Sequence, residues 1–189
     1  MNSPHAALPV EVRETLEPGD DERVRDIVRS TAFFSPEEED IAVELVQETL
    51  ARGDASGYRF QFLSVGEACV AYTCFGRIPG TQSSFDLYWI ATHEGWRGRG
   101  LGRRLLSSTE ARIRALGGDR VYVDTSSRAQ YEPTRRFYER CDYRKAAQLD
   151  DFYGPGDGKV IYCRALGDGP ASNREAASLG PTGAPSTPR

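Results

Sequence analysis

The chain has 189 residues, enough for one domain with a substantial core but not comfortably for two. Its formal net charge of −4 argues against the broad basic face that nucleic acids and acidic membranes bind. No apolar run approaches the about 18 residues that span a bilayer, and the start, MNSPHAALPV, lacks the basic and apolar regions of a signal peptide. We therefore expect a protein that binds neither nucleic acid nor membrane, as a monomer or homodimer.

The cysteines indicate the compartment, and the histidines bear on whether the protein binds a metal. None of the four cysteines forms a C-x-x-C pair, and most lie in apolar, strand-like runs, so we expect buried thiols in a reducing, cytoplasmic compartment. These cysteines are Cys69, Cys74, Cys141 and Cys163. With only His5 and His93 available, a zinc site is improbable, and we expect no metal.

Both ends of the chain differ in composition from the middle. The stretch from Gly167 is rich in Gly, Pro, Ala, Ser and Thr and has almost no large apolar residues. Such a segment cannot bury enough surface to offset its ordering entropy. We predict a flexible N-terminus over 1–8, a folded domain over 9–166 and a disordered tail over 167–189.

The first elements follow from apolar periodicity. Residues 10–16, VEVRETL, alternate and predict a short strand. Residues 18–34 begin with acidic side chains, which favour a helix N-terminus, and continue as an amphipathic helix. Its apolar positions at helical spacing are Val24, Ile27 and Val28.

The second helix has the clearest start. Ser35 can cap it, Pro36 suits the first helical position, and Glu38 completes a capping box. Gly53 lies just past the expected end. The predicted apolar stripe consists of Ile41, Leu45, Val46 and Leu50.

The middle of the chain predicts a hairpin and then a strand–helix–strand unit. Residues 58–76 form two strand-like runs around a Gly66-Glu67 turn, and 85–92 is a further strand. Residues 98–116 predict a helix that Gly117 and Gly118 end. Its expected inward face is Leu101, Leu105, Thr109, Ile113 and Leu116.

The remaining elements are a strand over 120–125, a short helix from Pro133, and two strands over 143–153 and 159–166 that the loop GPGDG separates. The order is β-α-α-β-β-β-α-β-α-β-β. The unit over 85–125 implies a right-handed parallel crossover, and the hairpins imply antiparallel pairs. We therefore predict an α/β (α+β) fold, a mixed sheet of about seven strands with helices on both faces.

Glycines and arginines alternate where the strand over 85–92 runs into the next helix, in HEGWRGRGLGRRLL. Backbone amides in a helix's first turn have no intrahelical partner, and phosphates are natural ligands for them. The glycines let an anion approach the backbone and the arginines add positive charge, although a solvated helix end is the alternative. The pattern fits neither a P-loop nor a dinucleotide fingerprint.

The spacing that fits is R-x-x-G-x-G, running from Arg97 to Gly102. Here the sequence resembles the GNAT superfamily of acyl-CoA-dependent N-acyltransferases, over about residues 10–165. A second motif, RRFYERCDY at 135–143, is similar to the family's xxFYxxLGF. Asp142 replaces the glycine of that motif, and Tyr131 stands where many members have an asparagine. The downstream segments resemble a bacterial branch whose substrate is not assigned.

The resemblance implies a binding site for acetyl-CoA as co-substrate. The diphosphate would take the amides of residues 97–102, and the pantetheine arm would lie beside the strand over 85–92. A backbone amide near Ile90 would then polarise the thioester carbonyl. The expected cofactor-binding residues are Ile90, Ala91, Thr92, Arg97, Gly98, Arg99, Gly100, Leu101, Gly102, Arg103 and Tyr131.

The catalytic residues also follow from the resemblance. The family's tyrosine, a general acid for the leaving thiolate in many members, corresponds to Tyr138, although a core pair of Phe137 and Tyr138 is the alternative. Asp86 lies eleven residues before Arg97, at the offset of the catalytic glutamate of the histone-acetylating branch. We expect it to act as the base, directly or through water.

Other carboxylates remain open. Asp124, at the end of the next strand, is the main rival for the base, and Asp86 could instead be a strand-edge residue. Asp150 and Asp151 are better suited to binding a cationic substrate.

The predicted function is N-acetyl transfer from acetyl-CoA to a primary amine by direct attack in a ternary complex. The amine could be a small molecule, an amino acid or a peptide N-terminus. The alternative is a non-catalytic acyl-CoA-binding sensor or interaction module with the same fold.

Overall fold

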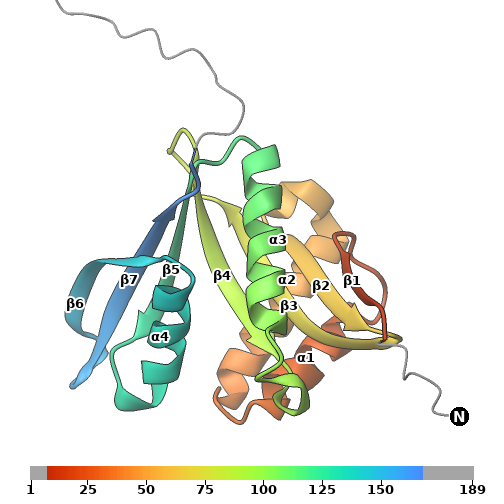
Figure 1. The fold of residues 1–189 in the computed structure, drawn as a ribbon, viewed down its shortest axis with the longest axis horizontal. Helices are drawn as coiled ribbons and strands as arrows, with labels where there is room; N and C mark the ends of the chain where they lie inside the picture. Colours follow the sequence, from red (N-terminus) through yellow and green to blue (C-terminus); the bar gives the residue numbers. More distant parts are fainter. Residues whose placement is uncertain (1–7, 168–189) are drawn as a thin grey trace, which may run out of the picture.

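Seven strands form one mixed sheet in the order β1-β2-β3-β4-β5-β7-β6 in the computed structural model, which describes residues 8–167 (Figure 1). The termini that we expect to lack structure, 1–8 and 167–189, lie outside the described residues except for Leu8 and Gly167. Figure 1 shows α3 and α4 on one face of the sheet and α1 and α2 on the other. The observed order of helices and strands is the predicted one, apart from three added 3-10 turns.

The helices of the first face have the predicted bounds within a few residues. β1 (Val10–Arg13) leads into α1 (Asp20–Ser30) and α2 (Pro36–Arg52). The capping box is confirmed, because the Glu38 amide donates to Ser35 Oγ over 3.3 Å and the Ser35 amide donates to the Glu38 carboxylate over 2.8 Å.

The apolar stripe predicted for α2 is partly wrong. Ile41 and Leu50 are 49% and 43% exposed. Val46 is buried as predicted and Leu45 partly so, whereas the other buried residues are Ala42 and Val43. The buried face of α2 is the one that contacts α1 and the sheet. Contact with these elements, and not the size of the apolar side chains, therefore determines which face of α2 is buried.

β2 (Arg59–Val65), β3 (Ala68–Arg77) and β4 (Ser84–Thr92) form an antiparallel meander, with Gly66 in a left-handed turn as predicted. The pairing of β3 with β4 is interrupted by a bulge, because Cys74 pairs with Trp89 while Phe75 pairs with Leu87. Tyr88 is therefore an extra residue in β4.

This bulge changes which way the side chains of β4 point. Phe85 and Leu87 pack into the core beneath α3 and α4, and Ile90 packs against that same core. Trp89 and Ala91 belong to the core beneath α1 and α2. The bulge therefore reverses the usual alternation in the second half of β4.

α3 (Leu101–Ala115) connects β4 to the parallel strand β5 (Arg120–Ser126). Only three residue pairs join these strands, from Ser84 with Arg120 to Asp86 with Tyr122. Beyond them the strands separate, and Figure 1 shows β4 and β5 meeting at the top of the view and parting toward the bottom. The sheet is thereby split along half its length.

α4 (Glu132–Arg140), β6 (Arg144–Gly154) and β7 (Asp157–Ala165) complete the fold, with β7 inserted between β5 and β6. Asp142, after α4, has φ +65°, which is the left-handed conformation expected where the family motif has glycine. None of the helices in the described part of the chain is long and apolar enough to cross a membrane.

Candidate functional site

A cavity of about 1080 Å³ opens where β4 and β5 separate. Its walls come from the second half of β4, the end of β5, the start of α3, α4, and the segment that joins α1 to α2. Of the predicted cofactor-binding residues, most line this one cavity: Ile90, Ala91, Thr92, Arg97, Gly98, Gly100, Leu101, Gly102, Arg103 and Tyr131. Tyr138 lines it as well, whereas Arg99 and Asp86 do not.

β4 borders the cavity with a free edge. Its residues after Asp86 have no partner on β5, while the opposite edge pairs with β3 up to Thr92 with Ala71. A strand edge of this kind presents backbone donors and acceptors that an extended ligand can pair with.

The start of α3 closes one end of the cavity. Gly98 and Gly100 have φ +75° and +77°, and a Cβ at either position would meet nothing within 4 Å. Their left-handed backbone, rather than crowding, therefore requires glycine. Gly100 caps the helix without a side-chain hydrogen bond, so the first-turn amides from Leu101 onward have no intrahelical acceptor. We expect the amides of residues 97–102 to bind the diphosphate, but the Arg97 amide already donates to the Glu94 carbonyl over 3.2 Å. This amide is therefore not available to the ligand.

The arginines of this turn have divergent roles. Arg97 and Arg103 line the cavity, and Arg97 also pairs with Glu94 over 2.6 Å. Arg99 turns away: its guanidinium lies 4.7 Å from the centre of the Trp96 ring and donates to the Gly95 carbonyl. Arg140 of α4 lines the cavity too; it lies in the RRFYERCDY motif, but the sequence assigned it no role.

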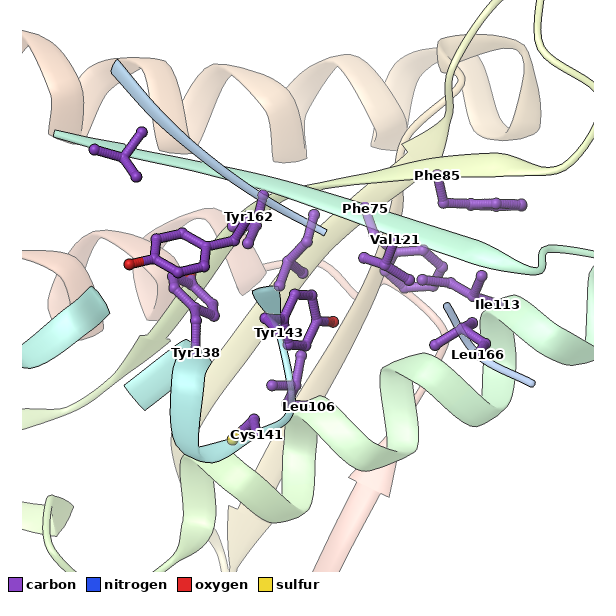
Figure 2. Packing of buried hydrophobic residues seen from close by; sticks show 13 residues of the cluster. Phe75, Phe85, Leu106, Ile113, Val121, Tyr138, Cys141, Tyr143, Tyr162 and Leu166 are labelled. Carbon is purple, nitrogen blue, oxygen red and sulfur yellow. The ribbon is translucent and has the colours of Figure 1, made fainter. Parts of the chain in front are cut away.

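Tyr138 belongs to both the core and the cavity. It is 4% exposed, and its ring centre lies 5.7 Å from that of Tyr143 and 5.9 Å from that of Tyr162 (Figure 2). Burial raises the pKa of Tyr138, and the nearby Cys141 and Asp124 raise it further. The phenol therefore stays protonated at neutral pH, and its hydroxyl has a proton to donate.

The two candidate bases lie on the opposite face of the sheet from Tyr138. Val121 and Val123 face the α3–α4 core, so Asp124 faces the other side, where it lines the cavity and is ion-paired with Lys159. Asp86 is half-buried and outside the cavity lining. Burial raises the pKa of Asp86, Asp124 raises it further, and Lys159 lowers it.

The end of the cavity away from α3 contains side chains that sequence reasoning did not identify. Phe33 and Phe34, between α1 and α2, contact Tyr131 and Trp89, each pair with ring centres 5.1 Å apart. Tyr131 thus faces the α1–α2 segment as well as the cavity. Further lining residues here are Glu38, Arg128, Tyr153 and Asp157. They come from separate elements and form no motif, so only the fold brings them together.

Asp150 and Asp151 do not line this cavity. Asp150 accepts a hydrogen bond from Gln148, and Asp151 accepts one from the Gly156 amide, both over 2.7 Å. The Asp151 bond lies across the β6–β7 turn, and the Asp150 bond lies within β6.

One buried hydroxyl in the cavity wall lacks a partner. Thr125 of β5 is 7% exposed and lines the cavity, and its Oγ1 has no hydrogen-bond partner among the described residues. A buried hydroxyl without a partner is costly, so a polar ligand atom is expected beside it.

Comparisons with known proteins agree on one family. The sequence model of the "Acetyltransferase (GNAT) family" matches residues 22–143. A Desulfovibrio desulfuricans protein assigned to this family shares 42% identity, with a TM-score of 0.82 over 84% of this chain and 99% of that chain. No curated protein matches significantly.

More distant structures share the fold alone. An aminoglycoside 6'-N-acetyltransferase in complex with coenzyme A aligns with a TM-score of 0.67 and 19% identity, over 85% of this chain and 99% of that one. The ribosomal-protein-S18-alanine N-acetyltransferase of Escherichia coli aligns with a TM-score of 0.63 and 18% identity, over 84% of this chain and 94% of that one.

Proposed function

The chain belongs to the GNAT family of acetyltransferases, whose co-substrate is acetyl-CoA, and we propose that it acetylates a primary amine by direct attack in a ternary complex. The observation that carries this proposal is the shared cavity. The free edge of β4, the open first turn of α3 and the protonated Tyr138 all border it.

The residues present fit acetyl-CoA. The amides of Leu101, Gly102 and Arg103 would hold its diphosphate, with Arg97 and Arg103 adding charge. The backbone of Ile90 and Thr92 would hold the pantetheine arm, and the unpartnered Thr125 hydroxyl supports a polar ligand beside that edge. Acetyl-CoA supplies the activated acetyl group as a thioester.

Tyr138 and Asp86 divide the proton transfers in this proposal. Tyr138 holds the proton that the departing sulfur needs. Asp86 has a raised pKa, because its carboxyl is half-buried and faces the charge of Asp124, and this makes its carboxylate a better proton acceptor than an ordinary aspartate. Since Asp86 does not line the cavity, a water molecule would relay the proton from the amine.

Release of free thiol from acetyl-CoA in the presence of a panel of amines tests the activity. We expect Tyr138→Phe to lower kcat by about 10²- to 10⁴-fold, the usual contribution of a general acid. Tyr143→Phe is the matched control, because it removes a hydroxyl from a neighbouring ring that does not line the cavity. Binding of acetyl-CoA without turnover of any amine would favour the non-catalytic module instead.

A further inference from the structure

The cavity has two chemically different ends. The end at α3 carries Arg97, Arg103 and the helix amides. Lining residues from the α1–α2 segment with the start of α2, the end of β5, the turn before α4 and the β6–β7 hairpin, which we call the acceptor end, are Phe33, Glu38, Asp124, Arg128, Tyr131, Tyr153 and Asp157. If the first end holds an anionic co-substrate, the second is left for the amine.

Aromatic rings at the acceptor end come from three separate parts of the chain. Phe33 precedes α2, Tyr131 precedes α4, and Tyr153 lies in β6. The Phe33 and Tyr131 rings meet edge to face with their centres 5.1 Å apart. The Arg128 guanidinium already lies 5.8 Å from the centre of the Tyr131 ring. The faces of Phe33 and Tyr153 are left to attract a substrate cation, by about 0.5–2 kcal/mol each.

Carboxylates lie among these rings. Burial raises the pKa of Tyr131, and the Glu38 carboxylate raises it further. Burial also raises the pKa of Tyr153; Lys159 lowers it, but Asp124 and Asp157 raise it again. The two tyrosines and the three acids all line the same cavity.

The cations of this region are already neutralised. Arg128 Nε lies 3.0 Å from the Asp157 carboxylate, and Lys159 is ion-paired with Asp124. Within the described chain, no cationic side chain pairs with Glu38 or with Asp86, which lies behind Asp124. The acceptor end therefore retains negative charge, and a carboxylate on the substrate would meet like charge there.

We infer that the acceptor is a diamine or polyamine, which presents one amino group to the acetyl donor and holds a second, positively charged nitrogen among the rings and carboxylates of the acceptor end. This inference rests on the proposed acetyl transfer. The buried Thr125 hydroxyl, which has no partner among the described residues, lines the same cavity, where either co-substrate could supply the missing hydrogen-bond partner.

Matched acceptors test the inference with the full chain. The panel pairs each α,ω-diamine, from propane-1,3-diamine to octane-1,8-diamine, with the monoamine and the ω-amino acid of equal length. We expect kcat/KM for the best diamine to exceed that of its monoamine by about tenfold, as one cation–π or ion-pair contact provides. The ω-amino acid should be the poorest of the three.

The outcomes separate this inference from the proposed function. Equal kcat/KM for diamines and monoamines, or preference for the amino acids, overturns the diamine inference and leaves acetyl transfer standing. Absence of thiol release with every amine overturns both.

Glu38→Gln gives a second test, because glutamine keeps the capping box while removing the charge. We expect KM for the best diamine to rise about three- to tenfold, with KM for the monoamine unchanged. Asp40→Asn, on the same helix but outside the cavity lining, is the control and should alter neither value. An equal rise in KM for both acceptors with Glu38→Gln contradicts the inference.

Discussion

The surroundings of Asp86 suit its proposed role as a base but destabilise the folded protein. Its carboxyl is half-buried and faces the charge of Asp124, and both conditions raise its pKa. A raised pKa makes the carboxylate a better proton acceptor and makes its ionised form less stable in the folded protein. The proposed base is thus also a source of instability at neutral pH.

We predict that Asp86→Asn lowers kcat/KM by about 10²- to 10³-fold while raising Tm at neutral pH. The folded carboxyl has the higher pKa, so its ionisation weakens the folded state above that pKa. Below the ordinary aspartate range both states are protonated, and the gain in Tm should vanish. Thiol release and thermal unfolding at several pH values measure the two effects.

The wild-type pH profile supplies a further check on Asp86. Activity that needs the Asp86 carboxylate should decline as the pH falls through its raised pKa, above the range of an ordinary aspartate. Asp124→Asn is the comparison: it should retain an acid limb but move it to lower pH, because the Asp124 charge raises the pKa of Asp86 and its loss also frees Lys159. Retained activity in Asp86→Asn together with loss in Asp124→Asn would assign the base to Asp124.

The residues of the cavity differ in how clearly the sequence indicates their place in the site. Tyr138 and the glycines at Gly98 and Gly100 lie in short motifs, so their place at the cavity could be predicted. Glu38 has a sufficient local explanation as a capping residue, which hides its second position in the cavity wall. Tyr153 lies in an exposed edge strand, where nothing nearby in sequence points to a site.

At the scale of elements, the start of α3 depends on backbone conformation. Gly100 and Gly80 have almost the same φ, +77° and +76°, and an added Cβ would meet nothing within 4 Å at either. Alanine at either position should therefore lower the free energy of unfolding by a similar amount, about 1–2 kcal/mol, because a side chain strains the left-handed backbone. Only Gly100 borders the cavity.

We predict that Gly100→Ala raises KM for acetyl-CoA by about tenfold or more, because relief of the strain tilts the first-turn amides of α3 away from the diphosphate. Gly80→Ala should leave this KM unchanged at a similar loss of Tm. Steady-state kinetics and thermal unfolding compare the two. An equal effect of both variants on KM would mean that lost stability, and not amide geometry, weakens binding.

The elements themselves could largely be predicted from local pattern, but their departures from regularity could not. Capping residues and periodicity were sufficient for α2 and α3, and the crossover rule was sufficient for the parallel pair of β4 and β5. The bulge at Tyr88 and the parting of β4 from β5 after Asp86 depend on long-range pairing, which no local pattern encodes. These two irregularities create the free strand edge of the site.

At the scale of the whole molecule, the split sheet has a consequence for stability. Only three residue pairs join β4 to β5, so beyond them the two parts of the sheet are held together by the core beneath α3 and α4, which includes residues of both strands. A ligand that pairs with the free edge of β4 would bridge this gap. Its binding energy should therefore stabilise the molecule as a unit.

We predict that acetyl-CoA at about 100 times its Kd raises Tm by about 5–10 °C, because such saturation stabilises the folded state by about 2.7 kcal/mol. Hydrogen exchange should slow most at residues 88–92 of β4 and at the start of α3, which border the cavity. Pantetheine at the same concentration is the control: it can pair with β4 but lacks the diphosphate, so it should shift Tm less and leave exchange at Leu101 to Arg103 unchanged. Equal shifts for both ligands would place the co-substrate elsewhere than on the first turn of α3, and no shift at millimolar acetyl-CoA would contradict its binding in this cavity.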